Sequence, residues 1–242
     1  KDILIICSPR DISNFKALLS DGSQLGIKIS YASQDKPRGL ADAFIVGKNF
    51  IDKDRVCLIL GDNIFYGHDF TSNLNNAKKR INGASIFGYP VSNPTDFGIL
   101  EISNKKEPIA IAEKPIKPKS NIAVTGLYFF DNDVIKIAEK IKPSKRGELE
   151  ITDVIRHYLK NKKLNVEMLG RGFAWLDTGT HEAMLSASKF IEIIEQRQGF
   201  KIACIEEIAY RKKWISAQKL KKIVKNFKTS EYGKYLIAVL ND

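Results

Sequence analysis

Several residue types and patterns are scarce in this sequence of 242 residues, and each absence excludes a class of protein. The three cysteines, Cys7, Cys57 and Cys204, are too few and too widely spaced for a disulfide framework or a zinc site. No apolar run reaches the roughly 18 residues that a membrane-spanning helix needs, and no signal peptide precedes the first apolar segment. We therefore expect free, buried thiols, a cytoplasmic location and no membrane partner.

Glycine-rich loops of the kind that cradle phosphates are also absent after the apolar segments. The three histidines lack the spacing of metal ligands. A dinucleotide-dependent oxidoreductase is therefore not expected, because its G-x-G-x-x-G turn should follow a strand.

Acidic residues are fewer than basic ones, 28 against 39, so the formal charge is +11. The segment 201–242 alone carries ten basic and four acidic residues, a net charge of +6. Those lysines are spread over helical patterns with few aromatic residues between them, which favours a solvated helix face over a nucleic-acid surface. We expect no nucleic-acid partner, while positive charge can steer polyphosphate substrates toward the protein.

The sequence does contain an alternation of apolar, strand-like runs and helical patterns. Strands over 3–7, 27–32 and 56–60 alternate with helices over 11–19 and 40–48. This β-α-β-α-β order predicts parallel strands with right-handed crossovers. We expect an α/β fold with an open, mostly parallel, Rossmann-like sheet and helices on both faces.

A shift in composition near Gly199 divides the sequence into two parts. We expect a core over 1–199 and a helical C-terminal segment over 200–242. Helical patterns dominate from Glu206 onward.

Two aspartates follow apolar runs at positions suited to a metal ion. The run 56–60 is typical of a strand buried on both faces, and Asp62 follows it after Gly61. Ligands of open α/β sheets bind beyond the carboxyl ends of strands, where a carboxylate can hold Mg²⁺. Asp177 repeats this pattern after a short apolar run and precedes Thr180, a candidate helix cap. Both aspartates are equally compatible with ordinary turns.

Other polar residues could bind a phosphorylated sugar. Glu113 and Lys114 end a predicted strand, where they could bind sugar hydroxyls and phosphate or form a weak surface pair. Arg146 precedes a predicted helix over 148–160 and could bind phosphate oxygens or face solvent. Gln34 offers a donor and an acceptor to a base edge.

Six segments, taken in this order, resemble the sugar nucleotidyltransferases over nearly the whole sequence. They are LGDNIFYGHDF at 60–70, EKP at 113–115, VTGLYFFD at 124–131, PSKRGELEITDV at 143–154, GRGFAWLDTGTHEAM at 170–184 and IACIEEIAYRKKWI at 202–215. The resemblance is to the enzymes that join dTTP and glucose 1-phosphate with Mg²⁺, giving dTDP-glucose and pyrophosphate. It implies that the protein catalyses the first step of dTDP-rhamnose synthesis. It also implies a nucleotide-binding half over about 1–95 and a sugar-binding half over about 96–199.

The resemblance also implies roles for individual residues. The implied catalytic residues are Asp62 and Asp177, which would hold Mg²⁺, and Lys114 and Arg146, which would bind the sugar phosphate. The implied substrate contacts are Gln34 and Gly39 for thymine, and Leu60, Asn63, Gly98, Glu113 and Val124 for the sugar. Trp175 is either a wall of the pocket or part of the core packing.

A second nucleotide site is implied near a subunit contact of a homotetramer, where dTDP-rhamnose would inhibit. Its residues would be Tyr66, Gly67, Phe70, Ala203, Glu207, Ile208 and Arg211. From spacing alone, Glu207 and Arg211 share a helix face and could be only an exposed ion pair.

The sequence departs from that family at its beginning. The family's first strand, its G-x-G-T-R-L loop and a lysine-bearing stretch have no counterpart, a gap of roughly fifty residues judged from motif order. We therefore expect the sequence by itself to be inactive. Two alternatives stay open: a related enzyme that uses UTP or another sugar 1-phosphate, and a regulatory protein of this fold without catalysis.

Overall fold

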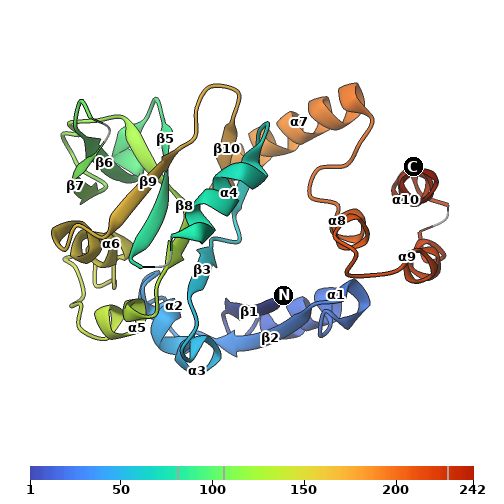
Figure 1. The fold of residues 1–242 in the computed structure, drawn as a ribbon, viewed down its shortest axis with the longest axis horizontal. Helices are drawn as coiled ribbons and strands as arrows, with labels where there is room; N and C mark the ends of the chain where they lie inside the picture. The colour runs from blue at the N-terminus through green and yellow to red at the C-terminus, as the bar shows by residue number, and fades with distance from the viewer. Residues whose placement is uncertain (81, 106, 228) are drawn as a thin grey trace. The chain divides into compact units, whose positions relative to one another are not determined.

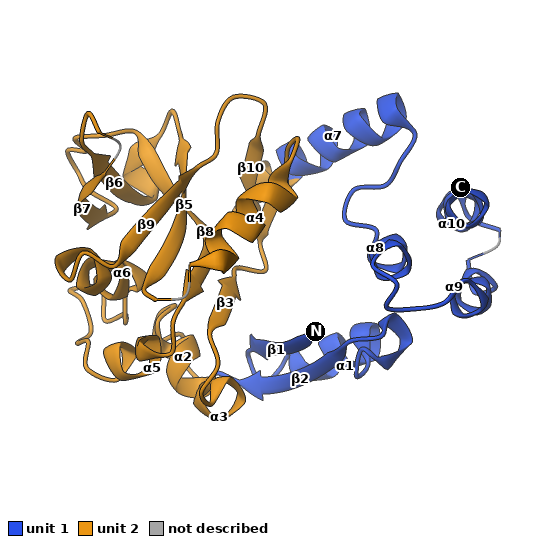
Figure 2. Ribbon diagram, viewed as in Figure 1, with its two compact units in different colours: residues 1–35, 185–242 blue, residues 36–184 orange. Residues whose placement is uncertain are grey.

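The computed structural model describes residues 1–80, 82–105, 107–227 and 229–242 (Figure 1). The chain divides into two compact units, shown in different colours in Figure 2. The first unit comprises residues 1–35 and 185–242, and the second unit comprises residues 36–184. In the described part of the chain, no helix is long and apolar enough to cross a membrane.

The second unit is built on a six-stranded sheet with the order β7-β6-β8-β5-β9, in which β3 also pairs with β8. The strands are β3 (Val56–Ile59), β5 (Ala84–Pro90), β6 (Gly98–Ile102), β7 (Pro108–Glu113), β8 (Ile122–Phe130) and β9 (Leu164–Met168). The central strand β8 is rich in aromatic and β-branched residues, which pack well on a pleated, buried surface. A separate pair is formed by β4 (Asn63–Tyr66) and β10 (Ala174–Asp177).

Helices cover both faces of this sheet, as the sequence predicted. Ile86 of β5 lies in a core with Phe44 of α2 (Asp42–Val46) and Ile155 of α6 (Ile151–Lys160). The next residue, Phe87, points to the opposite face, where it meets the helix α4 (Phe70–Lys79). Successive side chains of a strand alternate between faces, so one strand serves both cores. The remaining helices of the unit are α3 (Lys48–Ile51), α5 (Asp133–Ala138) and the 3-10 helix η2 (Pro94–Asp96).

The strand directions correct the prediction of a mostly parallel sheet, although the α/β class is confirmed. Among the described strands of the larger sheet, β5 and β9 pair in parallel, whereas β8 is antiparallel to β3, β5 and β6, and β6 to β7. The prediction used the alternation before residue 60, from which β1 (Asp2–Cys7) and β2 (Lys28–Ser33) do pair in parallel. Strand β3 instead pairs with the distant β8, and local alternation does not reveal such a partner.

The first unit combines the β1–β2 pair with helices, including the predicted C-terminal ones. They are α1 (Ile12–Leu19), η1 (Ser23–Leu25), α7 (His181–Gln198, whose first residues belong to the second unit), α8 (Ile205–Arg211), α9 (Ala217–Val224) and α10 (Glu231–Asn241). Its core contains Leu25, Leu220 and Leu236. Gly26 is required where η1 meets Trp214, because a Cβ there would overlap the Trp214 carbonyl and φ is +70°.

Three local predictions about this chain have different outcomes. Thr180 caps α7 as predicted, since its hydroxyl accepts a hydrogen bond from the Ala183 N–H at 3.1 Å. The thiols are free, but only Cys204 is buried, while Cys57 is exposed. The strand β3 is not buried on both faces: its exposure alternates, and Ile59 is 60% exposed.

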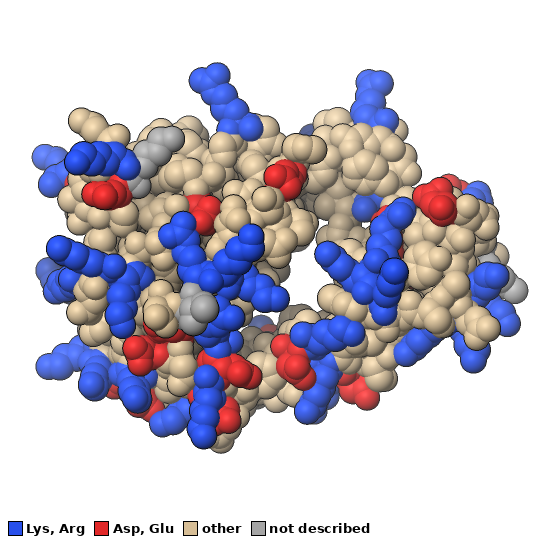
Figure 3. All heavy atoms as spheres, viewed as in Figure 1, with Lys and Arg blue, Asp and Glu red and all other residues tan. Residues whose placement is uncertain are grey.

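Basic side chains are distributed over both units. Figure 3 shows Lys and Arg side chains interspersed with Asp and Glu on the visible face, without a single continuous basic patch. Charge alone therefore does not point to one binding surface on this face.

Candidate active site

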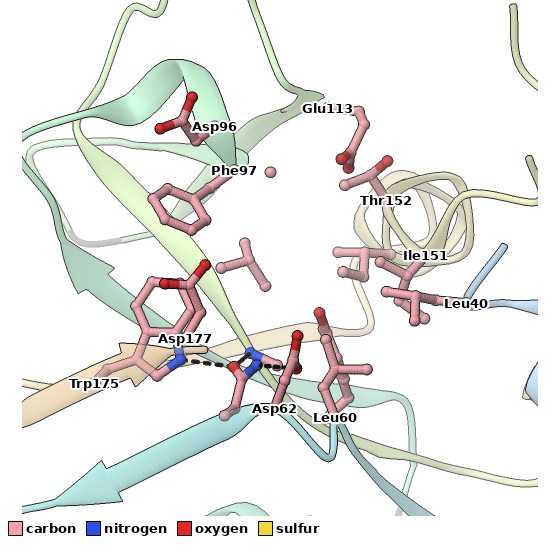
Figure 4. A pocket seen from close by; sticks show the side chains of 16 residues that line it. Leu40, Leu60, Asp62, Asp96, Phe97, Glu113, Ile151, Thr152, Trp175 and Asp177 are labelled. Atoms are coloured by element: carbon pink, nitrogen blue, oxygen red, sulfur yellow. Dashed lines mark hydrogen bonds between the residues drawn. The ribbon is translucent and has the colours of Figure 1, made fainter. Parts of the chain in front are cut away.

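A cavity of about 170 Å³ opens in the second unit, where strands of both sheets end near the beginning of α6 (Figure 4). Its lining residues are Leu40, Leu60, Asp62, Asn63, Asp96, Phe97, Gly98, Glu113, Val124, Gly126, Tyr128, Ile151, Thr152, Ile155, Trp175 and Asp177. In the view of Figure 4, Asp62 and Asp177 lie toward one end of the pocket and Glu113 and Thr152 toward the other.

The two aspartates reach this pocket from a turn and from the end of a strand. Asp62 lies in the turn between β3 and β4, and Asp177 ends β10. Because β10 runs antiparallel to β4, Asp177 stands opposite Asn63. The backbone N–H and the hydroxyl of Thr178 both donate to the Asp62 carbonyl, at 2.9 and 3.1 Å. The pairing of β4 with β10 therefore brings two carboxylates into one pocket.

The side chain of Asn63 connects three parts of the pocket. Its Oδ1 accepts hydrogen bonds from the backbone N–H of Gly126 at 3.0 Å and from Nε1 of Trp175 at 2.7 Å. Its Nδ2 donates to Oδ1 of Asp62 at 2.8 Å. A Cβ on Gly126 would overlap the Asn63 amide, so this close approach requires glycine.

One wall of the pocket is aromatic. The Trp175 ring lies 5.1 Å from the ring of Phe97 and 5.8 Å from that of Tyr89, centroid to centroid. Trp175 is only 8% exposed, yet it lines the pocket. The sequence left two roles open for Trp175, pocket wall and core packing, and the structure shows both.

Glu113 and Arg146 form a charged group beside the pocket. Arg146 lies 3.5 Å from Glu113, 2.9 Å from Glu148 and 3.6 Å from Glu150. Burial raises the pKa of Glu113, and the nearby Glu150 carboxylate raises it further, while Arg146 acts in the opposite direction. Arg146 is thus shared by three carboxylates, one of which faces the pocket, so its single positive charge offsets only part of their negative charge.

Four of the residues predicted to contact substrate lie outside the lining of this pocket. Arg146 lies 3.5 Å from Glu113 without lining the pocket, and Lys114 is exposed, with its backbone N–H donating to the Phe97 carbonyl at 3.0 Å. Gly39 has a φ of +105°, and a Cβ there would lie 2.5 Å from the Leu149 carbonyl oxygen. Gln34 belongs to the first unit, whereas the pocket belongs to the second.

The residues of the predicted regulatory site are divided between the units. Tyr66, Gly67 and Phe70 belong to the second unit, and Ala203, Glu207, Ile208 and Arg211 belong to the first. Within the first unit, Arg211 lies 2.7 Å from Glu207 and 3.3 Å from Asp242. These three side chains and Tyr235 contribute to a cavity of about 350 Å³.

Several pocket residues were missed by the sequence reasoning. Gly126 had a signal, since an isolated glycine within a strand often marks a close approach of backbone. Thr152 had no such signal: it faces Gly98, and a Cβ on Gly98 would lie 3.0 Å from the methyl carbon of Thr152.

Tyr128 is another missed residue of the pocket. Burial raises the pKa of Tyr128, with Glu113 and Asp62 adding to the effect, so its hydroxyl stays protonated. Leu40, Asp96, Phe97, Ile151 and Ile155 complete the missed set.

Comparisons with known proteins agree with this architecture. The family described as nucleotidyl transferase matches residues 1–193. A glucose-1-phosphate thymidylyltransferase of Neisseria meningitidis is 51% identical over 240 residues, covering 99% of this chain and 83% of the relative. One from Xanthomonas campestris is 49% identical over 239 residues, covering 99% and 81%. One from Mycobacterium tuberculosis is 48% identical over 240 residues, covering 99% and 83%.

Solved structures that are similar to this chain have related descriptions. A Bacillus anthracis protein described as a glucose-1-phosphate thymidylyltransferase, in complex with sucrose, superposes with a TM-score of 0.71 at 36% identity. That match covers 77% of this chain and 74% of the other. A UDP-glucose pyrophosphorylase complexed with UDP-glucose has a TM-score of 0.65 at 23% identity, covers 78% and 80%, and shares the fold.

Proposed function

The chain belongs to the nucleotidyl transferase family, within its glucose-1-phosphate thymidylyltransferases, and from that premise we propose that its second-unit pocket binds the glucose 1-phosphate side of the reaction. The overall reaction joins dTTP to glucose 1-phosphate and gives dTDP-glucose and pyrophosphate. A phosphate oxygen of glucose 1-phosphate attacks the α-phosphorus of dTTP, and the bond to the leaving pyrophosphate breaks. The observation that carries the proposal is that Asp62, Asp177 and Glu113 line one pocket.

Members of this family use a divalent metal, and the donors of the pocket fit one. Asp62 supplies hard carboxylate oxygens from the turn before β4, and Asp177 supplies them from the end of β10, which pairs with β4. Mg²⁺ is usually held by one or two carboxylates, with waters and substrate phosphates completing its shell. Among the residues that the structure describes, no group of three or more His, Cys, Asp or Glu side chains could hold a metal by itself. Bound Mg²⁺ would offset negative charge on the nucleotide phosphates.

The sugar is proposed to lie between Glu113 and the aromatic wall. The Glu113 carboxylate accepts hydrogen bonds from sugar hydroxyls, and Gly98 leaves space in front of Thr152. Leu60 and Val124 supply apolar lining, as expected for a pocket with few oriented polar groups.

The phosphate and base contacts remain those suggested by the resemblance. Lys114 and Arg146 are proposed to bind the sugar phosphate, and Gln34 and Gly39 are proposed to contact thymine. Catalysis then consists of positioning the two substrates and stabilising charge, as in other phosphoryl transfers.

The wider setting of the enzyme is part of the same proposal. It includes a cytoplasmic homotetramer, a place at the start of dTDP-rhamnose synthesis, and inhibition by dTDP-rhamnose at Tyr66, Gly67, Phe70, Ala203, Glu207, Ile208 and Arg211. A nucleotide half over about 1–95, a sugar half over about 96–199 and a helical segment over 200–242 complete it.

The test is a substrate survey of the full-length protein with Mg²⁺, following nucleotide sugar and pyrophosphate by ³¹P NMR. With glucose 1-phosphate as the sugar substrate, turnover with dTTP should exceed turnover with UTP. With dTTP as the nucleotide, turnover with glucose 1-phosphate should exceed turnover with another sugar 1-phosphate. Higher turnover with UTP or another sugar would assign the chain to a related enzyme. Binding of dTDP-rhamnose without turnover of any pair would point to the regulatory alternative.

A further inference from the structure

The amide of Asn63 is almost fully engaged inside the protein. A carboxamide offers two acceptor sites on oxygen and two hydrogens on nitrogen. Here the oxygen accepts from Gly126 and Trp175, and one amide hydrogen is donated to Asp62. At most one hydrogen of Asn63 is left for a sugar hydroxyl, so contacting substrate is the smaller part of what this side chain does.

The orientation of this amide follows from its partners. The backbone N–H of Gly126 and the indole N–H of Trp175 can only donate, so both must face the Asn63 oxygen. The NH₂ group then has to point toward Asp62. The lack of a side chain at Gly126 permits the approach that makes this arrangement possible.

We propose that Asn63 is a positioning residue that holds the Asp62 carboxylate in its metal-binding orientation, and that Trp175 holds Asn63 in turn. The proposal rests on the metal role proposed above for Asp62. In the described part of the chain, Asn63 is the one side chain that hydrogen-bonds the Asp62 carboxylate. Partners that orient a ligand in this way restrict its rotamers and raise metal affinity.

This arrangement connects the aromatic wall with the metal carboxylate. The Trp175 ring packs against Phe97 in the pocket wall. Its indole N–H is donated to Asn63, the residue that holds Asp62. A substitution at Trp175 should therefore weaken metal binding, although its ring is assigned to the sugar side. A role for Trp175 in packing alone would not affect the metal.

The experiment measures Mn²⁺ binding by electron paramagnetic resonance with dTDP-glucose present, together with kcat and KM for glucose 1-phosphate. Asn63→Leu keeps the branching of the side chain, enlarges it and removes all three hydrogen bonds, and should weaken Mn²⁺ binding by about 10- to 100-fold. Trp175→Phe keeps an aromatic ring and removes one donor, and should weaken it by about 2- to 10-fold.

Matched controls lie elsewhere in the chain. Asn132→Leu removes amide hydrogen bonds to the Asp52 and Asp54 carbonyls and should leave Mn²⁺ binding unchanged. Trp214→Phe alters the other tryptophan, which belongs to the first unit, and should also leave it unchanged. Thermal unfolding of each variant identifies a folding defect, and Trp175→Phe decides the matter if Asn63→Leu does not fold.

Asp62→Asn separates this proposal from the one on which it rests. If Asp62→Asn weakens Mn²⁺ binding but Asn63→Leu and Trp175→Phe do not, the positioning role is overturned and the metal role of Asp62 stands. If Asp62→Asn itself leaves Mn²⁺ binding unchanged, the metal assignment fails and the positioning role fails with it. Graded losses in the order Asp62→Asn, Asn63→Leu and Trp175→Phe support both.

Discussion

Arg146 in the second unit and Arg211 in the first are both surrounded by carboxylates, and their side chains are similarly exposed, at 43% and 54%. Their acidic partners differ. Beside Arg146, the side chain of Glu150 is 9% exposed and that of Glu148 is 36% exposed, and the pKa of Glu113 is raised mainly by burial. Beside Arg211, the side chain of Glu207 is 17% exposed and that of Asp242 is 67% exposed, and the hydrogen bond from Arg211 to Glu207 raises the pKa of the guanidinium.

This difference shows that the environment of the acids, more than the arginine itself, sets what each cluster can do. Partly buried carboxylates with a raised pKa are poorly solvated, so a substrate that brings new partners can reorganise them. Exposed ion pairs are screened by water and contribute about 0–1 kcal/mol to stability. We therefore expect catalysis to depend on the charges around the second-unit pocket and to be indifferent to those around Arg211.

The largest expected effect tests whether charge in the second unit is catalytic at all. Asp177→Asn preserves shape and removes one proposed metal ligand, so turnover should fall by more than about 100-fold, since even outer partners of a metal are worth about 10- to 100-fold. Asp242→Asn is the matched change in the first unit and should leave turnover unchanged. Equal losses of turnover in both variants, measured at limiting Mg²⁺, would show that charge at the second-unit pocket has no special role in catalysis.

The next effect contrasts the two arginines on the sugar substrate. Arg146→Ala should raise KM for glucose 1-phosphate by about 10- to 100-fold, because a lost charge-assisted hydrogen bond costs about 1.5–3 kcal/mol. KM for dTTP should change much less. Arg211→Ala serves as the control, with both Michaelis constants unchanged. Equal weakening of both substrates by Arg146→Ala would refute the sugar-phosphate role.

A third effect concerns backbone space in the pocket. Gly126→Ala should lower the free energy of unfolding by about 1–3 kcal/mol and disturb catalysis, because its Cβ would overlap the Asn63 amide. Gly170→Ala is the control in the same unit, since a Cβ there meets no atom within 4 Å. Denaturant titration of both variants measures the difference, and similar stabilities would show that the Asn63 amide can move at little cost.

A smaller effect tests the other side of the comparison. If the first-unit cluster is regulatory, Arg211→Ala should relieve inhibition by dTDP-rhamnose while leaving the Michaelis constants nearly unchanged. Coupling between distinct sites is typically about 1–3 kcal/mol, and the low end corresponds to about a five-fold rise in the inhibition constant. Inhibition that is purely competitive with dTTP and indifferent to this substitution would argue against a second site.

The smallest effect is in the pH dependence of stability. Burial raises the pKa of Glu113 above its ordinary value of 4.5, so the native state binds this proton more tightly than the unfolded state. Its contribution to stability is present at lower pH and declines as the pH rises through the raised pKa. Glu113→Gln should remove this decline.

Glu195 in the first unit supplies the opposite case. Burial acts to raise its pKa, but the hydrogen bonds from Lys201 and from the Ile202 N–H outweigh it, and the pKa is lowered. Its contribution is present above the ordinary pKa and is lost as the pH falls through the lowered value. The change in melting temperature caused by Glu113→Gln and the change caused by Glu195→Gln should therefore vary with pH in opposite directions across the acid range. Variation in the same direction would contradict these assignments.

The sequence by itself determined the local elements and the residue types of the site. Helical periodicity predicted a helix over 148–160, close to the observed α6 (Ile151–Lys160), and Thr180 predicted the start of α7. Apolar runs ending at glycine singled out Asp62 as a carboxylate after a strand. These features depend on contacts between residues near one another in the chain, so they leave a readable pattern.

Tertiary structure decided which of these elements meet. The antiparallel pairing of β8 with β3, β5 and β6, and of β6 with β7, made the larger sheet mostly antiparallel. Cys57 of β3 is exposed, although its neighbours in sequence are apolar. The pairing of β4 with β10 placed Asp177 opposite Asn63, and the gap at Gly126 let the Asn63 amide reach across. The physical reason is that strand partners and side-chain hydrogen bonds are selected by packing between distant segments, which periodicity along the chain does not encode.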